Sequence, residues 1–287
     1  MPDTIMPRPR ALPPVIEDHC YLRHGDRELR ARVFMPAFEG GPFPCLIELH
    51  GGGWQGGDLE DRNGIGQFLA PAGFVVVALN FRQGADGYPA SLADINYGVR
   101  WAKADAAKLK IDPRRVAIGG ASTGAHLAML AAMRPRDRRY ASIPLPAGSP
   151  RVDAHIDAGV DAVVMHWPII NPLSRYRSLL RDNRRFRFGI EYWRTEANAT
   201  EGNPMLALER GERVELPRAI WIQGRPDPLH DYRDPDTDFP GNKPERFVSN
   251  YRKAGGEIEL VYFDKDSRET NALLVTREFL RQALTPA

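Results

Sequence analysis

The stretch GGASTGAHLA contains a serine in a setting that suits nucleophilic catalysis. Ser122 stands in the G-x-S-x-G motif Gly120-Ala121-Ser122-Thr123-Gly124, which follows the apolar run RVAIG and precedes the apolar run AHLAML. We therefore expect a strand, a sharp turn at Ser122 and then a helix, because small flanking residues let strand and helix approach. A plain helix N-cap is the alternative, which the strand before and the apolar helix after disfavour.

A run of three glycines offers backbone donors for a developing oxyanion. The motif His50-Gly51-Gly52-Gly53-Trp54 follows the apolar run CLIEL, which we expect to be a buried strand. Without Cβ atoms, the backbone N–H groups of such a run can face outward, as an oxyanion hole requires. A phosphate-binding loop is the rival interpretation, but its G-K-[ST] ending is absent. Together the two motifs indicate acyl transfer to a serine.

Short apolar runs alternate with helical segments from Pro44 onward. The runs CLIEL, FVVVALN, RVAIGG, DAVVMHW and AIWIQG are typical of strands that are buried on both faces. Apolar residues three or four positions apart predict helices between them. This alternation predicts an α/β fold with a doubly wound, mostly parallel sheet and helices on both faces. Before Pro44, CYLRH and LRARVFMP predict an antiparallel pair of strands.

The 287 residues are expected to form a single α/β domain with two additions. Residues 1–15 are rich in proline and are predicted to lie as an arm over the body. Residues 173–211 interrupt the alternation and are predicted to form an inserted cap over the carboxyl ends of the strands. Arg184, Arg185 and Arg187 in this segment hint at a carboxylate-bearing substrate, although a solvated helical face is the simpler interpretation.

Composition excludes several classes of function. The 39 Lys and Arg residues against 37 Asp and Glu residues leave a formal charge of +2, without a basic run that would suggest a nucleic-acid partner. Cys20 and Cys45 lack metal-ligand spacing and are expected to be free thiols. Because no apolar leader or bilayer-length apolar segment is present, we expect a soluble cytoplasmic protein without a membrane partner. No metal or organic cofactor is expected, since the chain has neither a ligand cluster nor a dinucleotide fingerprint.

The motifs HGGGW and GGASTGAHLA together resemble those of the α/β-hydrolase fold, and within it the hormone-sensitive-lipase-like esterases and the small carboxylesterases. The likeness extends over roughly 44–263 and includes NPMLALERGE and FVSNYRKAGGEIELVYF. It implies that Ser122 is the serine that becomes acylated. It also implies that the amides of Gly52, Gly53 and Thr123 form the oxyanion hole.

The resemblance assigns roles to three more residues. His50 and His126 match structural positions, so neither is expected to transfer protons. Asp227, in the stretch QGRPDPLHDY, matches the acid of the catalytic triad, which orients an imidazole and stabilises its protonated form. A turn aspartate is the alternative there, because Asp-Pro is a common turn pair.

The usual catalytic base is missing from its expected position. In the resembling family a histidine follows the strand that matches IELVYF, but here the loop reads FDKDSRETN. Arg268 stays protonated near neutral pH, and the hydroxyl of Ser267 is a far weaker base than imidazole. Lys265 would need a large fall in its pKa, which the acidic loop opposes.

His230 is the candidate for the vacant role. It stands three residues after Asp227, and the loops that carry acid and base are neighbours in the resembling fold. A compressed triad of Ser122, His230 and either Asp227 or Asp231 is therefore our hypothesis. His166, at the end of the run DAVVMHW, is expected to pack beneath the cap or to contact the substrate.

These features predict a serine-dependent carboxylic-ester hydrolase that forms an acyl-enzyme from esters with small or medium acyl groups. Four residues are predicted to line its substrate pocket: Trp54, His166, Tyr192 and Trp193. One alternative is a binding protein of the same fold with reduced catalysis. Another is a lyase, amidase or lactonase with the same oxyanion hole. A small-molecule ester is the expected partner, and the sequence leaves a homodimer open.

Overall fold

The computed structural model describes residues 12–146, 156–182, 188–264 and 268–285. The described residues form one sheet of eight strands in the order β1-β2-β4-β3-β5-β6-β7-β8. The pairs β1·β2 and β2·β4 are antiparallel, and the pairs from β4 to β8 are parallel. The strands are β1 (Val15–His24), β2 (Arg27–Met35), β3 (Phe43–Leu49), β4 (Val75–Leu79), β5 (Ile111–Ala121), β6 (Ala162–His166), β7 (Arg218–Arg225) and β8 (Ile258–Asp264).

The predicted fold class is confirmed, and each predicted apolar run of the central sheet forms a strand. Strand side chains alternate between two apolar layers. Ile47, Val75 and Val77 belong to one cluster, whereas Leu46 and Val76 belong to the other. Both faces are thus covered by helices, which explains why these strands are apolar throughout.

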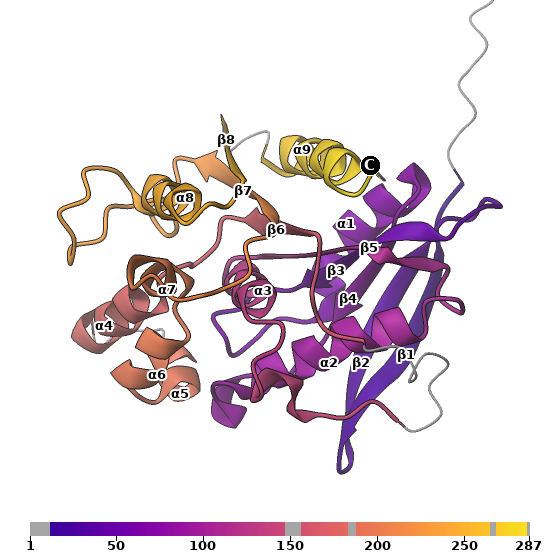
Figure 1. Ribbon diagram of the computed structural model, residues 1–287, viewed down its shortest axis with the longest axis horizontal. Coiled ribbons are helices and arrows are strands. Elements are labelled where there is room, and N and C mark those ends of the chain that lie inside the picture. The colour runs from indigo at the N-terminus through magenta and orange to yellow at the C-terminus, as the bar shows by residue number, and fades with distance from the viewer. Residues whose placement is uncertain (1–11, 147–155, 183–187, 265–267, 286–287) are drawn as a thin grey trace, which may run out of the picture.

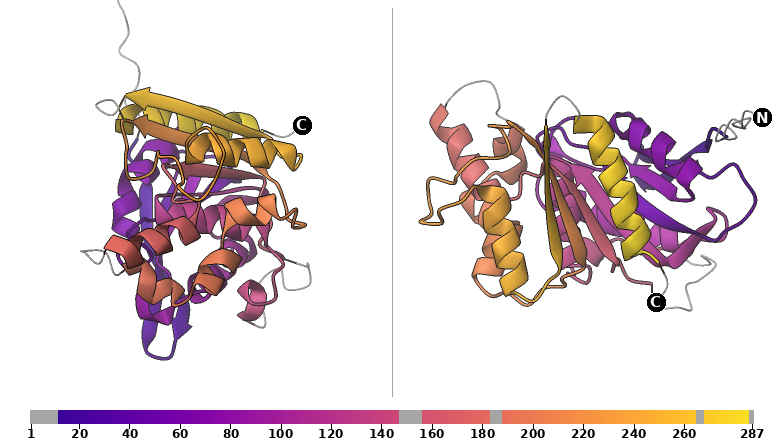
Figure 2. Two further views of the ribbon diagram at one scale, coloured as in Figure 1. Left: turned by 90° about the vertical axis from the view of Figure 1, so that its left-hand side faces the viewer. Right: turned by 90° about the horizontal axis from the view of Figure 1, so that it is seen from above.

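Helices cover the two faces of the sheet unequally. Helices α1 (Asn63–Leu69) and α9 (Arg268–Ala283) lie on one face, whereas α2 (Ala90–Ala104), α3 (Thr123–Met133) and α8 (Lys243–Lys253) lie on the other (Figures 1 and 2). Single helical turns of the 3₁₀ type connect some of these elements: η1 (Leu59–Arg62), η2 (Ala70–Ala72), η3 (Gly84–Asp86) and η4 (Tyr140–Ser142). None of the helices in the described ranges is long and apolar enough to cross a membrane.

The segment predicted as a cap is helical. It contains α4 (Pro172–Asp182), α5 (Phe188–Trp193), α6 (Glu196–Glu201) and α7 (Pro204–Glu209), which lie together beside α8 (Figure 1). Its function as a cap remains a prediction. Residues 183–187, with the three arginines singled out in the sequence, lie outside the described part, as do residues 1–11 of the predicted arm.

A buried ionic network joins α4, α8 and the loop between β7 and α8. Asp234, which is 2% exposed, accepts hydrogen bonds from Ser174 at 2.5 Å and Asn171 at 2.9 Å. It also pairs with Lys243 and Arg246, each at 3.1 Å. Because every one of these groups is removed from water, the carboxylate is the common partner that makes their burial tolerable.

Replacement of Asp234 by alanine is expected to lower the free energy of unfolding by about 3–5 kcal/mol, because Lys243 and Arg246 would stay buried without their common partner. Urea unfolding followed by circular dichroism measures this loss. Asp236→Ala is the matched control. Its exposed pair with Arg177, at 3.5 Å, should contribute less than about 1 kcal/mol. Equal losses in the two variants would contradict this account of the network.

Candidate active site

Ser122 lies at a strained turn between β5 and α3. Its backbone dihedrals are φ 53° and ψ −116°, a region that non-glycine residues rarely adopt. The turn is held by backbone hydrogen bonds, since Ser122 N donates to His166 O at 2.9 Å and Ile169 N donates to Ser122 O at 3.1 Å. The serine side chain is only partly covered. Strain at such a position is typical of a nucleophile presented above a sheet.

The flanking glycines are required by the close approach of β3 to this turn. A Cβ atom at Gly124 would lie 2.3 Å from His50 O, and one at Gly120 would lie 2.7 Å from Leu49 O. Both contacts are shorter than real Cβ contacts and involve backbone atoms that cannot swing away. The motif therefore has a steric cause that is visible in the structure.

The glycine run after β3 lies against the serine turn. Gly52 has φ +111°, and a Cβ atom there would lie 2.1 Å from Gly56 O, so only glycine fits. Trp54 N approaches Thr123 Oγ1 at 3.4 Å, which ties this loop to the start of α3. Within the described part of the chain, the amides of Gly52, Gly53 and Thr123 have no hydrogen-bond acceptor. Their role as donors to a substrate oxygen remains a prediction.

His230 reaches the serine from the loop after β7. Its Nε2 lies 3.1 Å from Ser122 Oγ, and its Nδ1 lies 2.9 Å from Asp227 Oδ2. Because an ionised carboxylate can only accept, Nδ1 carries the proton and Nε2 is left as an acceptor for the serine hydroxyl. The residue is 7% exposed. This is the geometry that a general base needs.

The structure distinguishes the two candidate acids. Asp227 also accepts from Gln223 Nε2 at 3.1 Å and from Leu229 N at 3.2 Å, so its carboxylate is fixed in front of the imidazole. Asp231 instead accepts from Arg225 at 2.6 Å and from Asn242 at 2.8 Å. Asp227 is therefore the carboxylate that contacts His230. Sequence reasoning missed Gln223, whose position in β7 carried no functional signal.

The loop that lacks the usual histidine is only partly described. β8 ends at Asp264, residues 265–267 lie outside the described ranges, and α9 begins at Arg268. The predicted absence of a base in that loop therefore remains a prediction. What the structure does place is an imidazole from a different loop at the serine.

A cavity of about 380 Å³ opens at Ser122. Its size falls at the lower end of the range for small-molecule sites. Most of its walls are apolar. The single charged side chain among its described lining residues is that of Arg175, in α4. The lining residues are Gly52, Gly53, Trp54, Ser122, Ile169, Arg175, Leu179, Gly189 and Leu229. Of the four predicted pocket residues, Trp54 is among them.

Tyr192 and Trp193 do not line the cavity. Both are fully buried in α5, where Trp193 packs against Trp54 with ring centroids 5.5 Å apart and against His126 at 5.6 Å. The rings of both residues pack against the ring of Trp54, which does line the cavity. The prediction placed them at the surface of the pocket because the apolar pattern of a short helix does not show which side faces a cavity.

His166 also lies away from the cavity. Its Nε2 contacts Thr276 Oγ1 of α9 at 2.8 Å, and it borders a separate hollow with Arg62 and Ala272. Its side chain shares a face with Val164, which belongs to the layer under α1 and α9. Strand alternation thus directs the imidazole to the face opposite α3. Its backbone carbonyl accepts the hydrogen bond from Ser122 N at the serine turn.

Two other histidines have structural environments. His126 is fully buried, where its Nδ1 accepts from Trp54 Nε1 at 3.2 Å and its Nε2 donates to Gly202 O at 2.9 Å. Burial lowers its pKa to about 4. His50 stacks on Phe81 with ring centroids 4.4 Å apart, and burial lowers its pKa as well. Both imidazoles are neutral at physiological pH, as packing residues would be.

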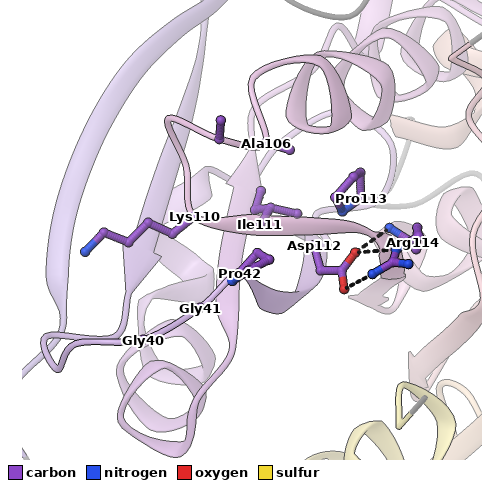
Figure 3. Close-up of a pocket in the computed structure, with 10 residues that line it drawn as sticks. Gly40, Gly41, Pro42, Ala106, Lys110, Ile111, Asp112, Pro113 and Arg114 are labelled. Carbon is purple, nitrogen blue, oxygen red and sulfur yellow. Dashed lines mark hydrogen bonds and ion pairs between the residues drawn. The ribbon is translucent and has the colours of Figure 1, made fainter. Parts of the chain in front are cut away.

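A larger hollow of about 510 Å³ lies at the opposite end of the strands. It borders the start of β5, and Lys110 and Asp112 are among its lining residues. Asp112 pairs there with Arg114 (Figure 3). No group of three or more histidine, cysteine, aspartate or glutamate side chains within the described ranges could hold a metal ion. The larger hollow is remote from Ser122, so the smaller cavity is the candidate site.

The sheet order, the strained serine between β5 and α3, and the glycine loop after β3 define an α/β-hydrolase fold. Residues 32–178, about half of the chain, match the family model BD-FAE, and the chain belongs to this family.

Curated relatives include esterases that match part of the chain. Carboxylesterase NlhH of Mycobacterium tuberculosis is 31% identical over 132 residues, which are 45% of this chain and 41% of that protein. Versiconal hemiacetal acetate esterase of Dothistroma septosporum is 31% identical over 123 residues, which are 42% of this chain and 38% of that protein. The match thus spans about two fifths of the length of these relatives.

Solved structures match almost the whole chain. An esterase of Thermogutta terrifontis with bound propionate superposes with a TM-score of 0.70 at 23% identity, covering 95% of this chain and 96% of that one. The carboxylesterase EstE1, cloned from a metagenomic library, gives a TM-score of 0.71 at 21% identity and covers 96% of this chain and 92% of that one. At this identity the likeness establishes the fold.

The low pKa of His126 predicts a loss of stability in acid. Between pH 6.5, the ordinary pKa of histidine, and about 4, the unfolded chain binds a proton that the folded chain does not. Stability must therefore fall as the pH falls through this window, by about 3 kcal/mol in all. Urea unfolding of the wild type and of His126→Gln from pH 4 to pH 8 measures this difference.

The variant removes the titrating group, so its stability should depend less steeply on pH over the same window. Coincident pH slopes for the two proteins between pH 4 and 6.5 would show that His126 is not buried as a neutral imidazole.

Proposed function

We propose that this protein is a serine-dependent carboxylic-ester hydrolase that acts through an acyl-enzyme on esters with small or medium acyl groups. The observation that carries the proposal is the chain of contacts from Ser122 Oγ to His230 Nε2 at 3.1 Å and from His230 Nδ1 to Asp227 Oδ2 at 2.9 Å. The relatives NlhH, a carboxylesterase, and versiconal hemiacetal acetate esterase support ester hydrolysis. The modest volume of the cavity supports small acyl groups.

In the first half of the proposed reaction, Ser122 Oγ attacks the ester carbonyl while His230 Nε2 accepts the hydroxyl proton. The Asp227 carboxylate stabilises the imidazolium that forms. The carbonyl oxygen gains negative charge as the tetrahedral intermediate develops, and the amides of Gly52, Gly53 and Thr123 donate to it. Collapse of the intermediate breaks the bond to the alcohol, which takes the proton from His230.

The second half repeats these steps with water. His230 accepts a proton from water as the water oxygen attacks the acyl-enzyme carbonyl, and the same amides hold the second oxyanion. Collapse releases the carboxylic acid and returns the proton to Ser122. The base of this mechanism is rooted in the loop that also carries the acid, which differs from the arrangement in the resembling esterases.

Turnover of p-nitrophenyl butyrate tests the proposal. The wild type should hydrolyse this ester, Ser122→Ala should fall to background, and His230→Gln should lose about 10²- to 10⁴-fold in kcat because the general base is removed. Asp227→Asn should also lose most of its turnover, since the imidazole would no longer be held in its productive tautomer.

Asp231→Asn is the matched control in the same loop, because Asp231 contacts Arg225 and Asn242 and not the imidazole. It should retain most of the wild-type kcat. Full activity in His230→Gln would show that another group is the base, and a silent wild type would overturn the proposed function.

A further inference from the structure

Arg175 is the one charged side chain among the described residues that line the cavity at Ser122. It projects from α4 on the same helical face as Leu179, one turn further on, which also lines the cavity. In the sequence it lies within the basic stretch RYRSLLRDNRRFRFG, which is typical of a solvated face. The structure instead places Arg175 against the reacting serine's cavity.

The guanidinium of Arg175 has no acidic partner among the described residues. It donates through Nη2 to Leu229 O and lies over the ring of Tyr232, with Cζ 5.8 Å from the ring centroid. Its Nε is buried and donates to no described residue. A cation with a buried, unused donor is costly unless a ligand supplies the missing acceptor.

Two nearby arginines, Arg177 and Arg246, have the carboxylate partners that Arg175 lacks among the described residues. Arg177 lies two residues further along α4, where it pairs with Glu196 at 2.9 Å and with Asp236 at 3.5 Å. Arg246 of α8 pairs with Glu209 at 2.7 Å and with Asp234 at 3.1 Å. Each of these guanidinium groups faces two carboxylates within the protein. Arg175 faces the substrate cavity.

We propose that Arg175 determines specificity for esters that carry a carboxylate, which it binds while Ser122 attacks the ester group. The inference rests on the proposed function, since it names a substrate class for the same site. A guanidinium matches the planar geometry of a carboxylate and binds it with charge-assisted hydrogen bonds. The single positive charge among the described lining residues balances one negative charge, as in a monoester of a dicarboxylic acid. The apolar walls fit the short carbon chain between the two groups.

Arg175 also touches the loop that carries His230, so a purely structural role must be separable from substrate binding. Bracing of that loop would affect every ester alike, because the loop positions the base and not the substrate. Recognition of a carboxylate would affect only substrates that carry one. The ratio of kcat/KM between a charged ester and its neutral match is therefore the readout.

The experiment compares monomethyl glutarate with dimethyl glutarate, and O-butanoylglycolate with its methyl ester, by chromatographic measurement of the released acids. The first pair places the charge on the acyl side and the second on the alcohol side. The wild type should prefer the charged member of at least one pair. Arg175→Gln, which removes the charge and keeps a polar side chain, should lose about tenfold or more in kcat/KM for that charged ester and change little for its neutral match.

Two further variants sharpen the test. Arg175→Lys should keep part of the preference because it keeps the charge, and Arg177→Gln should keep all of it because Arg177 is paired outside the cavity. Equal losses for charged and neutral esters in Arg175→Gln, or a wild type that hydrolyses both members of each pair equally well, would overturn this inference and leave the proposed function standing. Absence of turnover for every ester would overturn both.

A binding measurement separates recognition from catalysis. In Ser122→Ala, calorimetry should show tighter binding of the preferred charged ester than of its neutral match. Replacement of Arg175 by glutamine in that background should remove the difference. Equal affinities in Ser122→Ala for both members of each pair would overturn the inference.

Discussion

The constraint on which this site depends is that Asp227, the proposed acid, and His230, the proposed base, share one loop and lie three residues apart. His230 N and Asp231 N both donate to Asp227 O, at 3.2 and 2.8 Å, so the loop turns back on itself and brings the imidazole to its own carboxylate. This contact is local and needs little from the rest of the chain. The contact with Ser122 is different, because it joins residues 108 positions apart.

The sheet and the buried network provide that long-range placement. Strand β6 separates β5, which leads to Ser122, from β7, which leads to Asp227, so the carboxyl ends of these strands meet at one edge. Asp234 then ties the loop to α4 and α8 through partners that are themselves buried. The loop must be anchored in this way because a general base is useful only within hydrogen-bond reach of its proton.

The partners of the ring nitrogens separate the histidine proposed to transfer protons from those that pack, since all three are buried. His126 and His50 lie in apolar surroundings that lower their pKa, and each uses a ring nitrogen to hold a backbone carbonyl. His230 instead has a carboxylate on one ring nitrogen and a serine hydroxyl on the other. A carboxylate stabilises the protonated form that a base must adopt, whereas an apolar cage disfavours it.

Backbone requirements were readable from the sequence, and side-chain directions were not. The strands, the serine turn and the glycine loop follow from apolar runs and from positions where only glycine fits, such as Gly52 and Gly124. Which face a side chain takes depends on register, so His166 and Trp193 were predicted in the pocket and lie elsewhere. The basic stretch that begins at Arg175 favoured a solvated helical face; Arg177 does form exposed ion pairs, but Arg175 borders the cavity. The choice between Asp227 and Asp231 required their partners in space.

The central claim is that His230 activates Ser122, and the rate of covalent labelling by a fluorophosphonate tests it most directly. Mass spectrometry of the labelled, digested protein locates the adduct, and intact-protein mass against time gives the rate. We predict a single adduct on Ser122 in the wild type and labelling at least about a hundredfold slower in His230→Gln. An adduct on another residue, or equal labelling rates in the two proteins, would contradict this account.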